Sequence, residues 1–195
     1  MKKTWMIHFT ACVFLLIFSQ QALPQDYPKH EFFGGFTYTG MGTRNWVGWK
    51  TSVVRNINRY LGITVDYTRI HASSSEFLLF EAYNTEASRY FILAGPRFTD
   101  RTVGKWVLYA HFLFGAQGTS ISYSYDQYGQ PPRTGVFEKN SFAMSAGGGI
   151  NYRIKGPIAL RLSHVDFIGC RIDEGWEKGV MLSFGLLVYQ GTGSD

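Results

Sequence analysis

Long segments in which bulky apolar residues alternate with small or polar residues constrain this fold most strongly. In residues 140–154, Phe142, Met144 and Ile150 share one parity, while serine, glycine, asparagine and arginine occupy much of the other. Successive side chains of a β-strand point to opposite faces, so this pattern predicts strands with one apolar face. The alternation recurs in residues 60–70 and 177–189. No segment shows the three- and four-residue apolar spacing of an amphipathic helix.

Turn-forming clusters divide the chain into eight such segments of about 10 to 16 residues. Strands of globular proteins usually have about 5–6 residues, whereas a strand that crosses a bilayer needs about 9–11. The lengths therefore favour membrane-spanning strands. The predicted strands are Glu31–Gly40, Asn45–Asn56, Tyr60–Ile70, Ser88–Asp100, Lys105–Ser120, Asn140–Ile154, Ile158–Ile168 and Glu177–Tyr189.

The connections between these segments alternate in length, which separates two interpretations of the apolar face. A soluble β-sandwich points that face inward and has no reason to sort its loops. A soluble lipocalin-like carrier, the remaining structural alternative, has eight strands and also points that face inward. An outer-membrane barrel points it to lipid, with short periplasmic turns and long outer loops. We therefore predict an all-β, eight-stranded antiparallel up-and-down transmembrane β-barrel with both termini periplasmic. The short connections are 57–59, 101–104 and 155–157; the long ones are 72–87, 121–139 and 169–176, and only 41–44 is a brief outer connection.

The first residues have the order of a secretory signal peptide: a basic start, an apolar stretch, then small and polar residues. Lys2 and Lys3 precede the mostly apolar residues 5–18. That stretch is too short to cross a bilayer as a helix, which needs about 20 apolar residues. We expect a signal peptide over residues 1–25, a barrel domain over residues 26–195, and a location in the bacterial outer membrane.

Composition agrees with export to a membrane and not with nucleic-acid binding. Charged residues make up only 17% of the chain and aromatic residues another 17%, against about 25% charged residues in ordinary soluble domains. The net charge is +5, but no basic cluster or stripe concentrates it, so we expect no nucleic-acid partner. Aromatic residues near both segment ends predict interfacial girdles, with Tyr38, Trp46, Trp49, Tyr90 and Trp176 outside and Tyr60, Phe98, Trp106, Tyr152 and Tyr189 at the periplasmic end.

Several stretches together resemble small bacterial outer-membrane β-barrel proteins, similar to the eight-stranded barrel of outer-membrane protein A. The resemblance covers nearly the whole mature chain, and it implies a β-barrel fold and an outer-membrane location. One departure is Tyr189, which stands one position out of register with the terminal aromatic residue that the barrel assembly machinery recognises in such proteins. The stretches are FFGGFTYT (32–39), NINRYLGITVDY (56–67), FILAGPRF (91–98), YAHFLFGA (109–116), NSFAMSAGGGINYRI (140–154) and IALRLSHVDF (158–167).

Charged residues on the small-residue parity are the candidate polar network of the lumen. An eight-stranded barrel is just wide enough for its side chains to fill it, so we expect these charges to pair with one another. Glu31 is expected to bridge part of an arginine cluster. The candidates are Glu31, Arg97, Arg153 and Arg161 near the periplasmic end, with Lys50, Asp66, His111 and Glu177 midway or higher.

A lipid-modifying enzyme, similar to outer-membrane lipid A deacylases, is one alternative, since His111, Ser163, His164 and Asp166 could form a hydrolase site. Ser163 and His164 are adjacent, however, and neighbouring side chains of a strand point to opposite faces, so we predict no catalysis. Histidine spacing predicts no metal site, and no cofactor is expected. Residues 147–149, three glycines, lack the lysine of a phosphate loop and indicate close packing.

Residues 121–139 are expected to form an outer loop, in which Tyr123, Tyr125 and Tyr128 make candidate contacts with an extracellular ligand. We predict a monomeric barrel with a structural or surface-interaction role, whose partners are outer-membrane lipid, the assembly machinery and such a ligand. A narrow porin for small solutes is the second alternative.

Overall fold

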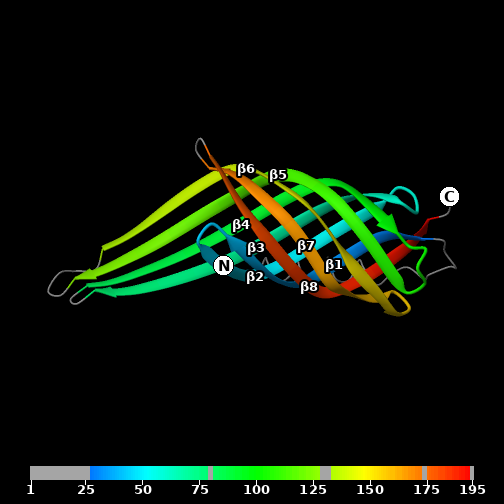
Figure 1. The fold of residues 1–195 in the computed structure, drawn as a ribbon, viewed down its shortest axis with the longest axis horizontal. Helices are drawn as coiled ribbons and strands as arrows, with labels where there is room; N and C mark the ends of the chain where they lie inside the picture. Colours follow the sequence, from blue (N-terminus) through cyan, green and yellow to red (C-terminus); the bar gives the residue numbers. More distant parts are fainter. Residues whose placement is uncertain (1–26, 79–80, 128–132, 173–174, 194–195) are drawn as a thin grey trace, which may run out of the picture.

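Eight antiparallel strands form a closed barrel, in which every strand pairs with its sequence neighbours and β8 pairs with β1 (Figure 1). The computed structural model describes residues 27–78, 81–127, 133–172 and 175–193. The predicted signal peptide lies outside these residues. The predicted strand number and up-and-down order are confirmed. The strands are β1 (Tyr27–Met41), β2 (Arg44–Asn56), β3 (Leu61–Leu78), β4 (Glu81–Asp100), β5 (Trp106–Gln127), β6 (Arg133–Lys155), β7 (Ile158–Ile172) and β8 (Gly175–Gly193).

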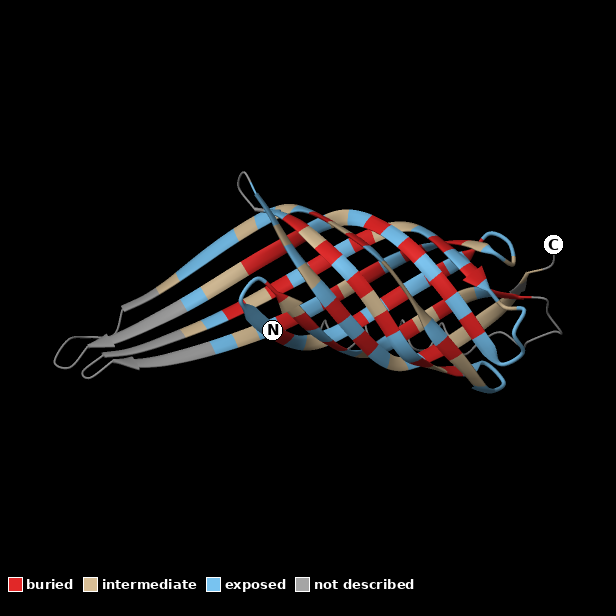
Figure 2. Cartoon of the chain, in the orientation of Figure 1, coloured by how far each residue is buried: buried red, intermediate tan, exposed pale blue. Residues whose placement is uncertain are grey.

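The barrel is apolar outside, and charged side chains are buried inside it. Phe36 and Phe184 are 68% and 57% exposed on the outer surface, whereas Lys50 and Arg97 are 2% and 1% exposed within the barrel. Along the barrel wall, buried and exposed positions alternate in the strands (Figure 2). Charged and polar side chains therefore fill much of the space that a lipocalin-like carrier would line with apolar residues. An apolar exterior around a polar interior is the arrangement of barrels that contact lipid.

Within the described ranges, no helix is long and apolar enough to cross a bilayer.

Short turns connect the strands at the end of the barrel where β1 begins and β8 ends, which we call the turn end. Two residues separate β6 from β7, and the first of them, Gly156, has a φ of 58°. A positive φ suits the tight turns of β-hairpins, and glycine adopts it without a steric penalty. At the opposite end, which we call the projecting end, the connections between strands differ from the predicted loops.

Four strands extend past the others at the projecting end, so that a four-stranded sheet stands beyond the barrel wall (Figure 1). β3 and β4 pair as far as Leu78 and Glu81, and β5 and β6 pair as far as Tyr125 and Arg133. The prediction of long loops over residues 72–87 and 121–139 is therefore wrong for most of their length. Their polar, serine- and tyrosine-rich sequences alternate too weakly to indicate strands because neither face has a barrel core to cover. We call residues 72–88 and 121–142 the projecting sheet.

A bulge in β7 corrects the predicted assignment of faces. Arg161 pairs with Gly185 and His164 pairs with Ser183, so Leu162 and Ser163 together oppose one residue of β8. A bulge inserts one extra residue and reverses the parity beyond it. Arg161 and His164 are consequently both buried in the barrel, while Leu162 and Ser163 are exposed outside. A second correction concerns Trp46, which is only 2% exposed inside the barrel and is not part of an outer aromatic girdle.

Two facing glycines leave room for large side chains where β1 meets β8. Gly35 pairs with Gly185, and a Cβ atom at Gly35 would lie 2.2 Å from the carbonyl oxygen of Phe184 and 2.7 Å from the Phe33 ring. At the neighbouring Gly34 nothing lies within 4 Å of such a Cβ. The strand tolerates a side chain on its outer face but not at Gly35.

We expect Gly35→Val to destabilise the barrel by about 1–3 kcal/mol, the usual effect of overpacking, because it would force β1 and β8 apart. Gly34→Val is the matched control and should leave stability close to that of the wild type. Urea unfolding of the barrel in lipid vesicles measures both variants. Equal stabilities for the two would contradict the inward position of Gly35.

Candidate functional site

A network of charged side chains fills the middle of the barrel and is centred on Lys50. The Lys50 Nζ lies 2.7 Å from Asp66 Oδ2 and 2.7 Å from Asp166 Oδ2. All three side chains are at most 3% exposed. Because an unpaired buried charge is very costly, the two carboxylates and the ammonium stabilise one another in this enclosed space. With His111 and His164, these residues form what we call the central cluster.

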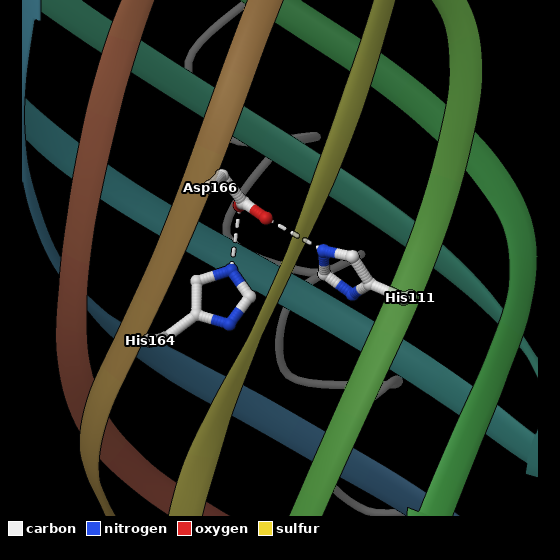
Figure 3. A group of neighbouring side chains, drawn as sticks. All are labelled: His111, His164 and Asp166. Atoms are coloured by element: carbon white, nitrogen blue, oxygen red, sulfur yellow. Dashed lines mark hydrogen bonds and ion pairs between the residues drawn. The ribbon is translucent and has the colours of Figure 1, made fainter.

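Two histidines hold Asp166 from either side (Figure 3). His111 Nε2 lies 2.6 Å from Asp166 Oδ1, and His164 Nε2 lies 2.6 Å from Asp166 Oδ2. The other ring nitrogen of His164 is 2.5 Å from the Tyr109 hydroxyl. Gly147 leaves the space for Asp166, since a Cβ there would lie 2.2 Å from Asp166 Oδ1. The glycine triplet thus serves close packing here.

His111, His164 and Asp166 also have the chemistry of metal ligands, with one donor atom of each within 4.8 Å of the others. Lys50 Nζ, however, lies 3.0 Å from His164 Nε2 as well as contacting Asp166. Its ammonium group already supplies positive charge to these donors. A divalent cation would have to overcome repulsion from Lys50, so the arrangement fits an internal ion-pair network better than a metal site.

A second group of charges, the arginine cluster, lies nearer the turn end. Glu31 is fully buried; its Oε2 lies 3.0 Å from Arg97 Nη2 and its Oε1 lies 2.6 Å from Arg101 Nη2. Arg161 is also buried, with its Cζ 4.0 Å from the centre of the Phe33 ring. Arg153 is partly exposed, with its Cζ 5.4 Å from the centre of the Tyr189 ring. The structure therefore brings Glu31 to Arg97, and to Arg101 rather than to Arg153 or Arg161.

Tyr109 separates the two clusters and contacts both. Its ring centre lies 4.0 Å from the Cζ of Arg97 and 4.7 Å from that of Arg161. Its hydroxyl meets His164 of the central cluster. One aromatic side chain thus links cations on one side to an imidazole on the other.

An apolar layer closes the interior between the central cluster and the projecting end. Its largest members, such as Phe91, Leu113 and Met181, are at most 1% exposed. Beyond this layer Arg89 Nη1 lies 2.6 Å from Glu177 Oε2, and the Arg89 Cζ is 4.7 Å from the centre of the Trp46 ring. Ion pairs and packed apolar side chains therefore fill the barrel along most of its length.

The possible hydrolase residues do not form a catalytic pair. Ser163 is exposed on the outer wall, whereas His164 is buried and bonded to Asp166 and Tyr109. The bulge that turns His164 inward leaves Ser163 outside.

The predicted contact residues of the 121–139 segment are placed only in part. Tyr123 and Tyr125 are on β5, but their side chains, and all of Tyr128, lie outside the described residues.

Strict alternation missed the residues that complete the interior. His164 and Asp166 follow the bulge, so parity counted from Arg161 places them outside. The weak signal for the bulge is that Arg161 and Asp166, both charged, occupy opposite parities of one predicted strand. Arg101 follows β4 in a turn, where no face can be assigned from spacing.

Comparisons with known proteins support the fold. No protein-family model and no curated protein sequence matches the chain. The structure is similar to that of Ail, the attachment invasion locus protein of Yersinia pestis, in complex with the heparin analogue sucrose octasulfate: the TM-score is 0.59, with 16% identity over 83% of this chain and 99% of that one. A second Ail structure gives 0.56, with 15% identity over the same shares. This chain has the fold of small outer-membrane β-barrels.

A further solved structure, Neisserial surface protein A, matches with a TM-score of 0.48 and 15% identity over 82% of this chain and 95% of that one.

We expect Lys50→Met to destabilise the barrel by about 3–5 kcal/mol, the usual effect of removing one partner of a buried ion pair. Asp66 and Asp166 would then be buried without their cation. Adding Asp66→Asn and Asp166→Asn to this variant should recover part of the stability because the unpaired charges disappear. The measurement is urea unfolding in lipid vesicles, with Arg55→Met on the outer face of the same strand as the control. A triple variant no more stable than Lys50→Met would refute this explanation.

Proposed function

We propose that this protein is an outer-membrane barrel that binds an extracellular partner through the projecting sheet. The observation that carries this proposal is the extension of β3, β4, β5 and β6 beyond the other four strands. The membrane location rests on the apolar outer wall and on the fold. The expected signal peptide fits export, and in this proposal the turn end faces the periplasm.

The filled interior supports a role outside the barrel rather than through it. Fully buried ion pairs and an apolar layer occupy the space that a solute would cross. We therefore favour surface interaction over the narrow porin. Catalysis has no support from the separated Ser163 and His164.

The projecting sheet has two edges that no neighbouring strand covers. The pairing of β2 with β3 begins at Val47 and His71, and the pairing of β6 with β7 begins at Ala143 and Cys170. Backbone groups beyond these pairs, on β3 and β6, have no partner strand on their outer side within the described residues. An uncovered edge can accept a strand of another protein. Val136 and Phe137, on the β6 edge, are 67% and 54% exposed and add apolar contact area.

Charge favours a protein partner over a polyanionic one. Residues 72–88 contain three glutamates and no lysine or arginine, and residues 121–139 carry two acidic and two basic residues. These segments together have three more acidic than basic residues, which repels a sulfated sugar of the kind bound to Ail. The partner that this sheet fits is an extracellular polypeptide with an extended, uncovered strand.

A polar hollow of about 580 Å³ lies at the base of the projecting sheet and adds to this surface. Serine hydroxyls and the side chains of Arg69, His71 and Glu86 line it. These groups include both hydrogen-bond donors and hydrogen-bond acceptors, so the hollow can hold polar side chains of the same partner.

Trimming the projecting sheet should abolish binding while the barrel still folds. His71, Ser88, Ser120 and Glu138 form one row of paired residues across the four strands. We would join His71 to Ser88, and Ser120 to Glu138, with Asn-Gly turns that suit two-residue hairpins. Bacteria that express the trimmed protein should adhere to epithelial monolayers no better than bacteria without the protein.

Two controls accompany this comparison. A variant with Asn-Gly in place of Gly42-Thr43 changes the β1–β2 turn and should keep full adhesion. Heat-dependent gel migration should show that every variant is folded in the membrane. Adhesion that survives trimming would refute the proposed surface, and competition by soluble heparin would show that the ligand is a polyanion.

Separately, Val136→Lys combined with Phe137→Lys should weaken adhesion without shortening the sheet. Charged lysines on an edge strand oppose the addition of another strand. The matched control is Thr43→Lys, which adds a lysine at an exposed position of the β1–β2 turn, outside the projecting sheet. Equal losses from the two variants would show that charge alone, rather than the β6 edge, controls binding.

A further inference from the structure

Arg161 differs from the other buried cations of the barrel. Among the described residues it is the only buried lysine or arginine with no carboxylate within ion-pair distance, whereas Arg89 and Arg97 each have one and Lys50 has two. It is 2% exposed. An unpaired buried charge is costly enough that proteins rarely retain one without compensation.

Counted over lysines, arginines and carboxylates, the charges of the described interior do not balance. Four carboxylates, Glu31, Asp66, Asp166 and Glu177, are paired with four cations, Lys50, Arg89, Arg97 and Arg101. Arg161 is one positive charge beyond these pairs, and Arg153 at the turn end is partly exposed to solvent. One negative charge would neutralise the buried excess.

The surroundings of Arg161 hold its guanidinium but leave one edge unused. The rings of Phe33 and Tyr109 lie 4.0 and 4.7 Å from its Cζ, and its Nε donates to Asn151 Oδ1 at 3.2 Å. Its Nη2 has no hydrogen-bond partner among the described residues. Ring faces attract the cation but do not accept this in-plane N–H bond.

Asn151 supplies a second unused donor, on the same side-chain amide that accepts from Arg161 Nε. It pairs with Arg161 across β6 and β7, it is 0% exposed, and its Nδ2 also has no partner among the described residues. Two buried donors on adjoining residues, with an excess positive charge, are the features of an anion site. A buried amide donor without a partner costs about 1–3 kcal/mol, so a shared acceptor would relieve both residues.

We propose that Arg161 and Asn151 bind a monovalent inorganic anion, such as chloride, inside the barrel near its turn end. The guanidinium supplies the charge and Nη2, and the amide supplies Nδ2. The single excess charge favours a monovalent ion over a divalent one. The anion completes the polar interior, so its uptake is coupled to folding and does not depend on the projecting sheet.

The test is the dependence of folding on chloride at constant ionic strength, with gluconate, which is too large for an enclosed site, as the replacement anion. A ligand that binds only the folded state raises the folding constant by up to tenfold for each tenfold increase in its concentration. We expect this limiting slope of one for the wild-type full-length barrel, measured by urea unfolding in lipid vesicles. A slope of zero would overturn the proposal.

Asn151→Asp distinguishes the proposed role from a general salt effect. It keeps an acceptor for Arg161 Nε, removes the Nδ2 donor and supplies the negative charge that the anion would bring, so the barrel should fold with no dependence on chloride. Arg55→Met, on the outer face, should keep the wild-type dependence. If Asn151→Asp retains that dependence, the site is wrong.

Crystals of the wild-type barrel grown in bromide give an independent measurement. We expect anomalous scattering from one bromide beside Arg161 Nη2 and Asn151 Nδ2. Bromide peaks confined to the outer surface would contradict the site.

Discussion

Closure of the sheet is the constraint on which the rest of this structure depends. In a bilayer every backbone N–H and C=O group must bond within the protein because no water is available to it. Pairing of β1 with β8 meets this requirement for all eight strands. Once the ring is closed, one face of every strand must contact lipid, and this explains why large apolar residues such as Phe36 and Phe184 are the exposed ones.

The small circumference of an eight-stranded ring then determines what the interior can contain. Its side chains fill the lumen, and the chain divides this space into layers of different chemistry. The arginine cluster, the central cluster and the apolar layer follow one another from the turn end toward the projecting end. Tyr109 connects the first two, since its ring contacts Arg97 and Arg161 while its hydroxyl meets His164. Charges in such a space are stabilised by close partners. A single cation without a carboxylate partner, such as Arg161, therefore indicates that the interior holds a further negative charge.

Regular alternation was sufficient to predict the barrel and part of its interior from the sequence. It placed Lys50, Asp66 and Glu31 inward because β1, β2 and β3 keep an unbroken period of two over these residues. It failed at β7, where the bulge at Leu162 and Ser163 reverses the faces and brings His164 and Asp166 inside. Pairing between strands is also invisible to spacing, so the contact of Glu31 with Arg101 could not be anticipated. The signal peptide over residues 1–25 stays a prediction.

The projecting sheet shows where the requirement for closure ends. Inside a membrane an open strand edge would leave polar backbone groups unpaired, so β2 and β7 must cover β3 and β6 along the barrel wall. Beyond the wall water can bond to those groups, and β3 and β6 continue without these neighbours. Water is a replaceable partner for an edge, however, whereas a paired strand is not easily displaced. The same backbone that is sealed in the barrel therefore becomes, a few residues further on, an open edge, and it is to this edge that the proposed function assigns the binding of another protein.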